Sequence, residues 1–209
     1  MQLYDNPLSP NCRKVRAVAY ELGLSLQMIP IDIVKGGSRT PEFLAKNPNG
    51  RVPLLEDGDL LLWESNAIIS YLAGKAGRLL PTNPRDRAEV DRWMSWQLAH
   101  LGPALRQVAF ERIVKKLTGQ GAPDPAAIEA GMIEVRKACA VMEASLGARE
   151  YLAGALSVAD FALAAHFSVA PAAGIDVSPY PKLNAWLDRM LKRDSLKRAI
   201  EDARQLMGA

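Results

Sequence analysis

The chain shows two different patterns of apolar residues. Up to about residue 80, short runs with strand character alternate with stretches in which apolar residues recur at helical spacing. The helical stretch over Asn11 to Leu22 ends at Gly23, a residue type that often terminates helices. This order predicts an α/β domain that begins strand, helix, strand. The strand-like runs are Gln2 to Tyr4, Leu26 to Ile31, Val52 to Glu56 and Leu60 to Trp63.

Turn and cap signals predict three further elements of this region. Thr40, followed by a proline and a glutamate, is typical of a helix N-cap with proline at the first helical position. The pair Asp57-Gly58 lies between the last two strand-like runs, which predicts an antiparallel hairpin. Ser65 is expected to cap a helix that closes at Gly74 or Gly77.

Beyond residue 80 the strand pattern disappears. The segment Pro81-Thr82-Asn83-Pro84 interrupts regular structure, and helical periodicity follows it. Ser157 and Asp160 have the spacing of a capping box, in which each side chain bonds the other's backbone amide. We therefore expect an α/β domain over residues 1–78, a linker over 79–85 and an all-helical domain over 86–209. The expected helices cover residues 86–116, 125–146, 157–170, 181–192 and 195–207.

Composition limits the classes of function. Hydrophobic residues make up 49% of 209 residues, enough for a sizeable core. The 26 basic and 23 acidic residues are dispersed, which indicates no nucleic-acid surface. No stretch approaches the roughly 20 apolar residues that span a bilayer, and the first residues do not resemble a secretory signal, so we expect a cytoplasmic protein with no membrane partner. The two cysteines, Cys12 and Cys139, lack metal-ligand spacing, so no metal is expected.

The first candidate for chemistry lies where the first strand-like run gives way to a helix. Ser9 and Asn11 stand at this helix N-terminus, where free backbone amides favour anions. The Ser9 hydroxyl could stabilise a bound thiolate. Lowering a thiol pKa by two units requires roughly 2.7 kcal/mol, and one hydrogen bond to a charged acceptor contributes about 1.5 to 3 kcal/mol. In the alternative interpretation, Ser9 and Asn11 only cap the helix.

Two further junctions could bind a peptide-like ligand. A cis bond between Val52 and Pro53 would leave the backbone N–H and C=O of Val52 free to pair with an extended ligand, whereas a trans proline on an edge strand is the common alternative. Glu64 and Ser65 supply a carboxylate for a ligand ammonium and a hydroxyl with an amide for a ligand carboxylate. The alternative for this pair is again a helix cap.

Four segments together resemble the successive signatures of the cytosolic glutathione S-transferase superfamily. They occur in the family's order along the whole chain. The resemblance implies a thioredoxin-like N-terminal domain that binds glutathione, followed by an all-α helical bundle that carries the pocket for a second substrate. The sequence is similar to bacterial theta-, beta- and nu-like members, and the subclass stays open. The segments are Ser9 to Arg13, Asn47 to Leu55, Glu64 to Ile68 and Ser157 to Asp160.

The resemblance also implies roles for individual residues at the two ends of glutathione. Pro53 would be cis, and Val52 would pair with the cysteinyl backbone. Glu64 and Ser65 would hold the γ-glutamyl amine and carboxylate. Arg51 would lie near the glycyl end.

Two positions depart from the family pattern or are ambiguous within it. Related members have a histidine or glutamine that helps to hold the glycyl carboxylate, where this chain offers only Ser38 or Arg39. Cys12 takes the second position of a Cys-x-x-Cys pattern whose first position is Ser9, so an intramolecular dithiol mechanism is excluded. Cys12 is expected to be a buried packing residue, and the alternative is an activated thiol at the helix N-terminus.

The first long helix of the second domain carries the candidates for the second-substrate pocket. Phe110 could form an apolar wall, Arg106 lies beside it in sequence, and His100 precedes both on the same helix. His100 could instead lie at the interface of the homodimer that the resemblance implies, or be an ordinary packed or surface residue. Arg106 could equally be a surface charge.

Three functions fit these residues. The leading hypothesis is a transferase in which Ser9, helped by Asn11, keeps glutathione as a thiolate for attack on a small electrophilic or disulfide-containing substrate. The second is a glutathione-dependent disulfide or peroxide reductase. The third is a noncatalytic binding module built on the same fold.

Overall fold

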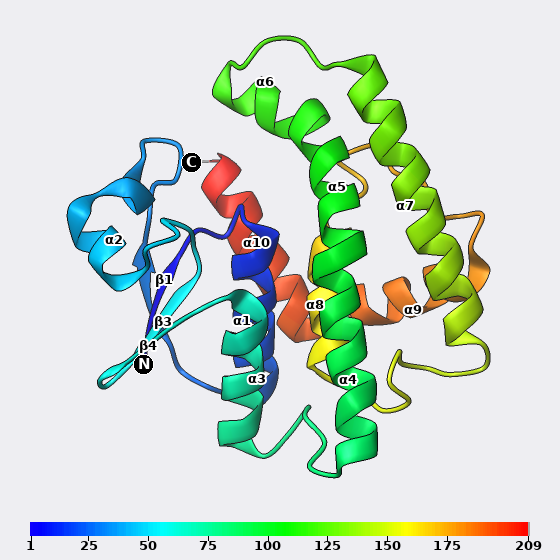
Figure 1. Ribbon diagram of the computed structural model, residues 1–209, viewed down its shortest axis with the longest axis horizontal. Coiled ribbons are helices and arrows are strands. Elements are labelled where there is room, and N and C mark those ends of the chain that lie inside the picture. Colours follow the sequence, from blue (N-terminus) through cyan, green and yellow to red (C-terminus); the bar gives the residue numbers. More distant parts are fainter. Residues whose placement is uncertain (209) are drawn as a thin grey trace. The chain divides into compact units, whose positions relative to one another are not determined.

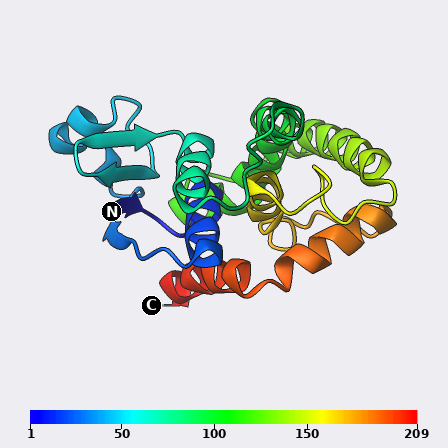
Figure 2. The ribbon, with the colours of Figure 1, turned by 90° about the horizontal axis from the view of Figure 1, so that it is seen from below.

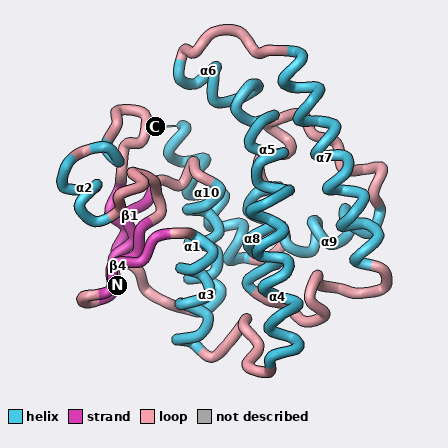
Figure 3. The backbone as a smooth tube through the Cα atoms, viewed as in Figure 1, coloured by secondary structure: helices cyan, strands magenta, loops and turns pink. Residues whose placement is uncertain are grey.

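The computed structural model describes residues 1–208, whose contacts divide into two compact units (Figure 1). The first unit consists of residues 1–80 together with the segment from Arg193 onward, and the second covers residues 81–192. All strands of the sheet belong to the first unit, and the second is built from helices and loops (Figure 3). The α/β and all-helical parts therefore follow the predicted order.

A four-stranded sheet forms the centre of the first unit, in the order β2-β1-β3-β4. β1 and β2 are parallel, whereas β3 pairs antiparallel with both β1 and β4. β3 begins two residues later than the predicted run, because Pro53 has no N–H to donate to a ladder. The predicted hairpin is present, with the turn at Gly58-Asp59. The strands are β1 (Gln2–Asp5), β2 (Gln27–Pro30), β3 (Leu54–Asp57) and β4 (Leu60–Trp63).

Helices cover both faces of this sheet. Figure 2 shows α1 and α3 together on one side and α2 on the other. The signals that predicted these helices are confirmed at three ends: Thr40 Oγ1 accepts from the Phe43 amide, and Gly23 and Gly77 end α1 and α3 in left-handed conformation. The apolar sides of α1 and α3 meet the sheet over fully buried leucines, isoleucines and valines. The helices are α1 (Pro10–Leu22), the 3-10 turn η1 (Gly37–Arg39), α2 (Pro41–Lys46) and α3 (Ser65–Ala76).

The last helix, α10 (Asp194–Gly208), belongs to the first unit rather than to the helical one. It packs along α1, as Figure 2 shows. The buried side chains of Leu196, Ala199 and Ala203 lie three to four residues apart and give α10 an apolar face. The compact units thus differ from the expected domain over 86–209 at its C-terminal end, since helical periodicity does not say which unit a helix packs against.

The second unit is a helical bundle around α8 (Val158–Phe167), every residue of which is buried. The region predicted as one helix over 86–116 runs from Pro84 to Thr118 with two π-helical turns in it. None of the helices among residues 1–208 is long and apolar enough to cross a membrane. The remaining elements are α4 (Pro84–Trp96), η2 (Gln97–Leu101), α5 (Gly102–Ala109), η3 (Phe110–Val114), α6 (Lys115–Thr118), α7 (Pro125–Leu146) and α9 (Pro181–Leu191).

The predicted capping box at the start of α8 is present. The Asp160 carboxylate, fully buried, accepts hydrogen bonds from the Ser157 amide and hydroxyl at 3.0 and 3.1 Å. It also accepts from the Leu152 amide and from Trp186 Nε1, both at 3.0 Å. Asp160 therefore joins the start of α8 to the preceding turn and to α9.

Candidate functional site

The loop from β1 to α1 places Ser9 at the helix N-terminus, as predicted. Ser9 is the N-cap residue, with Pro10 at the first helical position, but its side chain makes no capping bond. The Ser9 amide donates to the Asn6 carbonyl at 3.0 Å. Ser9 is therefore the cap of α1 by position, but its hydroxyl makes no bond to the amides of α1.

A hydrogen bond joins the helix that follows Ser9 to the second predicted junction. Ser65 Oγ donates to Asn11 Oδ1 at 3.1 Å. Ser65 is the first residue of α3 and not its cap, which is Glu64, and Glu64 makes no side-chain capping bond. The prediction that Ser65 caps α3 is therefore wrong, because its hydroxyl is turned to α1. The structure brings Ser9, Asn11, Glu64 and Ser65 to the adjoining N-termini of two helices.

The backbone at Glu64 is unusual. Its φ angle is 70°, in the region that side-chain-bearing residues seldom adopt, while its side chain is exposed. Such conformations cost of order 1–3 kcal/mol and cluster at binding and catalytic sites. This conformation turns the chain sharply from β4 into α3 and leaves the Glu64 carboxylate in solvent beside the start of α3.

The Val52-Pro53 bond is cis, in agreement with the prediction. Pro53 is buried and Val52 is half-buried. Among residues 1–208, Val52 makes no backbone hydrogen bond, because the pairing of β3 starts only at Leu54. The amide and carbonyl of Val52, two residues before the start of β3, are thus left without backbone partners.

The two predicted arginines lie in neighbouring loops. The Arg39 side chain covers Gly50, which precedes Arg51, so closely that a Cβ on Gly50 would lie 2.7 Å from Arg39 Nη1. Gly50 also has a φ of 58°, so a side chain there would both clash with Arg39 and require an unfavourable backbone conformation. Both guanidinium groups belong to exposed residues, whereas Ser38 is buried.

Cys12 is a buried packing residue, as favoured from the sequence. Its side chain has no exposed surface. Burial, and next the charge of Asp5, raise the pKa of the Cys12 thiol well above its ordinary value. Its sulfur accepts from the Asn6 amide at 3.5 Å. The alternative of an activated thiol is wrong, because a low thiol pKa requires exposure or a nearby cation.

Lys14 is a feature that the sequence reasoning missed. Its side chain is fully buried, and Nζ donates to Asn66 Oδ1 at 2.5 Å, in the first turn of α3. Burial lowers the pKa of Lys14 to about 7, although the charge of Glu64 opposes the shift. No local signal marks Lys14 in the sequence, because its partner Asn66 lies on another helix.

The three candidates for the second-substrate pocket do not share one surface. His100 stacks on Trp96, with ring centroids 5.8 Å apart, and lines a cavity of about 380 Å³ between η2, α5 and α7. Arg106 and Phe110 do not line this cavity. Both are exposed residues of the same helical run, Phe110 with 37% of its surface accessible. No group of three or more histidine, cysteine or acidic residues suited to a metal occurs in the part of the chain that the structure describes.

Comparisons with known proteins match both halves of the chain. Residues 1–74 match the family model "Glutathione S-transferase, N-terminal domain", and residues 103–194 match "Glutathione S-transferase, C-terminal domain". Glutathione S-transferase 3 of Zea mays is 35% identical over 96% of this chain and 93% of its own length. Glutathione S-transferase GstB of Escherichia coli K12 is 34% identical over 92% of this chain and 93% of its own.

A solved structure agrees with these sequence relatives. The theta class glutathione S-transferase of Xanthomonas axonopodis pv. citri, solved with glutathione bound, superposes with a TM-score of 0.88 at 32% identity. The match covers 95% of this chain and 96% of that one. Sequence and fold therefore lead to the same family.

Proposed function

This chain belongs to the cytosolic glutathione S-transferase superfamily, and we propose that Ser9 is the residue with which it activates glutathione. The protein is a glutathione transferase, which joins the glutathione thiolate to a small electrophile. The nucleophile belongs to the bound substrate, so the protein has to bind glutathione, lower the pKa of its thiol and place an electrophile beside it. The observation that carries the assignment of Ser9 is its place at the N-terminus of α1, where its side chain makes no capping bond.

The γ-glutamyl end of glutathione binds at the start of α3. The Glu64 carboxylate pairs with the ligand ammonium, and Ser65 binds the ligand carboxylate through its amide, since its hydroxyl donates to Asn11 Oδ1. The first turn of a helix favours an anion, because its amides have no partners within the helix. The unusual φ of Glu64 supports this role, since it keeps the carboxylate beside that turn.

The rest of the tripeptide extends along the first unit. Its cysteinyl backbone pairs with the free amide and carbonyl of Val52, which Pro53 follows. Its glycyl carboxylate lies between Arg39 and Arg51, which take the place of the missing histidine or glutamine. Two guanidinium groups suit a carboxylate, because each can donate two parallel hydrogen bonds.

Ser9 then acts on the sulfur. Its hydroxyl donates to the thiolate, and the N-terminus of α1 adds a favourable dipole, so the charged form of glutathione gains stability. Asn11 accepts the Ser65 hydrogen bond and thereby fixes the N-terminus of α1 next to that of α3. The thiol proton passes to solvent, and the thiolate sulfur attacks the electrophilic carbon. With an aromatic halide, the halide then leaves with the electron pair of the broken bond.

The remaining features of the proposal concern the second substrate and the assembly. The electrophile binds beside Phe110 and Arg106, the two exposed candidates on the helical run. The protein works as a homodimer in the cytoplasm, and its role is detoxification. Relatives solved with glutathione or with a glutathione conjugate support the use of such substrates.

The test is glutathione-dependent turnover of the purified chain with an aromatic halide, an isothiocyanate, a peroxide and a small disulfide. We expect conjugation of the halide or the isothiocyanate to exceed reduction of the disulfide and peroxide. If the protein reduces the disulfide faster than it conjugates either electrophile, it is a reductase rather than a transferase. Glutathione binding without turnover of any of the four would favour a binding module.

A further inference from the structure

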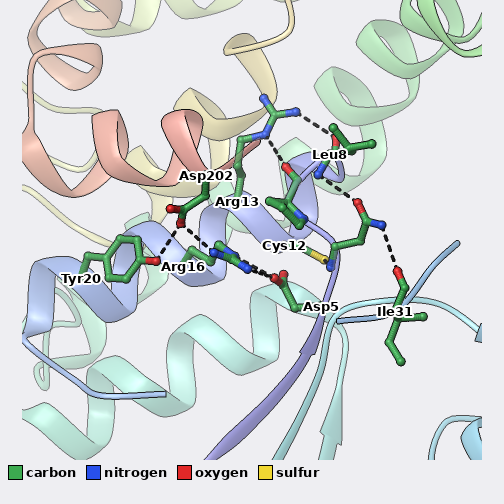
Figure 4. A network of polar contacts seen from close by, with 10 residues as sticks. Asp5, Leu8, Cys12, Arg13, Arg16, Tyr20, Ile31 and Asp202 are labelled. Carbon is green, nitrogen blue, oxygen red and sulfur yellow. Dashed lines mark hydrogen bonds and ion pairs between the residues drawn. The ribbon is translucent and has the colours of Figure 1, made fainter. Parts of the chain in front are cut away.

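A chain of three charged side chains runs from β1 through α1 to α10 (Figure 4). Arg16, on α1, donates from Nε to Asp5 Oδ2 at 2.7 Å and also from Nη2 to the same oxygen. Its Nη1 donates to Asp202 Oδ2 at 2.7 Å. Tyr20, one turn farther along α1, donates its hydroxyl to the same Asp202 oxygen at 2.7 Å. The guanidinium therefore lies between two carboxylates from opposite ends of the sequence.

The Asp5 end of this chain is deeply buried. Asp5 is 1% exposed, and its other oxygen, Oδ1, has no hydrogen-bond partner. A carboxylate out of water needs a counter-charge, because desolvation of an unpaired ion costs several kcal/mol. Arg16 supplies that counter-charge, and its own side chain is only 12% exposed. Removing Arg16 would leave Asp5 as an unpaired buried charge.

Asp5 is the last residue of β1, and residues 6–9, called the Ser9 loop below, connect it to α1. The next residue, Asn6, accepts from the Leu8 amide at 3.0 Å and donates to the Ile31 carbonyl at 2.9 Å. The Asn6 carbonyl accepts from the Ser9 amide. Arg13 closes the loop from the other side by donating to the Pro7 and Leu8 carbonyls at 3.1 and 2.9 Å. Asp5 and Ser9 are thus joined by a short backbone segment whose groups bond to one another and to Arg13.

Asp202 fixes the outer end of Arg16. Its side chain is 22% exposed, on the side of α10 that faces α1. A second contact fastens α10 where it begins: Glu21, near the end of α1, accepts from Arg193 and from Ser195 Oγ, the latter at 2.6 Å. Arg198 also lies over the Tyr20 ring, 4.0 Å from its centroid. The C-terminal helix is therefore held against α1 both near its start and farther along its length, and the second of these contacts leads through Arg16 to Asp5.

We propose that Arg16 and Asp202 are positioning residues for the Ser9 loop, so that the C-terminal helix sets the geometry of thiolate activation. The inference rests on the proposed role of Ser9. Asp202 orients the Arg16 guanidinium, Arg16 holds the Asp5 carboxylate, and Asp5 anchors the loop that carries the Ser9 hydroxyl. Small displacements matter here, since a shift of about 1 Å at a reacting centre can lower a rate by roughly a hundredfold.

The test compares Asp202→Asn with wild type in glutathione conjugation over a range of pH. Asparagine keeps the shape of the side chain but removes its charge, so we expect kcat to fall by about threefold to tenfold at neutral pH, with a higher apparent pKa in the pH-rate profile. Glu201→Gln is the matched control, because Glu201 is the neighbouring residue on α10 and is half-exposed. The control should keep the wild-type rate and profile.

A pair of substitutions at the buried end checks the direction of the effect. Arg16→Met should lower kcat by about tenfold or more, because it leaves Asp5 unpaired. Adding Asp5→Asn to Arg16→Met removes the unpaired charge and should restore part of the lost rate. If the double variant is no faster than Arg16→Met, or if Asp202→Asn has the wild-type pH-rate profile, the proposal is overturned.

The failure of this inference differs from a failure of the assigned role of Ser9. Ser9→Ala, assayed beside the other variants, should itself raise the apparent pKa. If Ser9→Ala leaves the rate and the apparent pKa unchanged, both the role of Ser9 and the role of its positioning residues are contradicted. If Ser9→Ala shifts the profile and Asp202→Asn does not, only the role of α10 falls. A cooperative unfolding transition for Asp202→Asn like that of wild type excludes loss of fold as the cause of a lower rate.

Discussion

Lys14 shows how far one buried residue can depart from what its type suggests. A lysine in a helix is usually on the surface, yet this one is fully buried and donates to Asn66 at the start of α3. Burial lowers the pKa of its ammonium from the ordinary 10.5 to about 7. A group whose charge is this costly makes the stability of the fold depend on pH.

We predict that Lys14→Met changes this dependence. Between pH 7 and 10.5 the unfolded chain keeps the Lys14 proton and the folded chain releases it, so wild-type stability gains about 1.4 kcal/mol per pH unit from this group as pH rises. The free-energy cost of burying the Lys14 charge is complete below about pH 7 and vanishes above 10.5. The variant's stability relative to wild type should therefore be highest near pH 7 and decline as pH increases, as measured by urea unfolding. Lys35→Met, at a side chain 86% exposed, is the control and should show no such trend.

Glu64 is the residue whose removal tests glutathione recognition most simply. Because its carboxylate is proposed to pair with the ligand ammonium, Glu64→Ala should weaken glutathione binding by about tenfold or more. Calorimetric titration of both proteins measures the dissociation constant. Glu42→Ala, at an exposed glutamate on α2, is the matched control. An unchanged dissociation constant for Glu64→Ala would remove this residue from the site.

At the scale of elements, local signals predicted most of what forms. The cap at Thr40, the stops at Gly23 and Gly77, and the hairpin after Asp57 need only neighbouring residues, so they could be read from the sequence. The two π-helical turns between α4 and α6 could not, because an apolar pattern of helical spacing does not reveal where one residue is added to a turn. The sequence predicts that Ser65 caps α3, whereas its hydroxyl bonds Asn11, because that partner lies on another helix and leaves no local signal.

Asp160 makes the stability of α8 depend on one carboxylate. It is fully buried and accepts four hydrogen bonds, from the turn before α8 and from Trp186 on α9. Asp160→Ala leaves these donors unpaired, so we predict a loss of about 3 kcal/mol or more in the free energy of unfolding. Asp188→Asn, at a carboxylate 59% exposed on α9, should cost less than about 1 kcal/mol. Equal costs for the two variants in urea unfolding would contradict the account of α8.

At the scale of the whole molecule, the candidate site residues could be named from the sequence, whereas the contacts that support them could not. The candidates that sit in sequence motifs, Ser9, Pro53 and Glu64, could be named because a strand-to-helix junction or a proline marks each of them. Lys14 and the contact between Arg16 and Asp202 could not, since they depend on which helices pack together. The placement of α10 on the first unit is the clearest case, because nothing in its own pattern distinguishes α1 from the bundle as its neighbour.

We predict that the protein is a homodimer. The edge strand β4 exposes Leu61 and Trp63, with 40% and 39% of their surfaces accessible, and a second copy would cover such an edge. Analytical ultracentrifugation should give about twice the chain mass of 22.8 kDa. A single species of chain mass at micromolar concentration would contradict the prediction.

The central claim, that Ser9 lowers the thiol pKa of bound glutathione, is tested most directly by titrating that thiol on the enzyme. Thiolate absorbance in the ultraviolet, recorded against pH for glutathione bound to wild type, Ser9→Ala and Cys12→Ser, gives the three pKa values. One lost hydrogen bond to a charged acceptor, about 1.5 to 3 kcal/mol, corresponds to an increase of about 1 to 2 units for Ser9→Ala. Cys12→Ser should titrate like wild type, because Cys12 is buried packing. A Ser9→Ala complex that titrates at the wild-type pKa would contradict the claim.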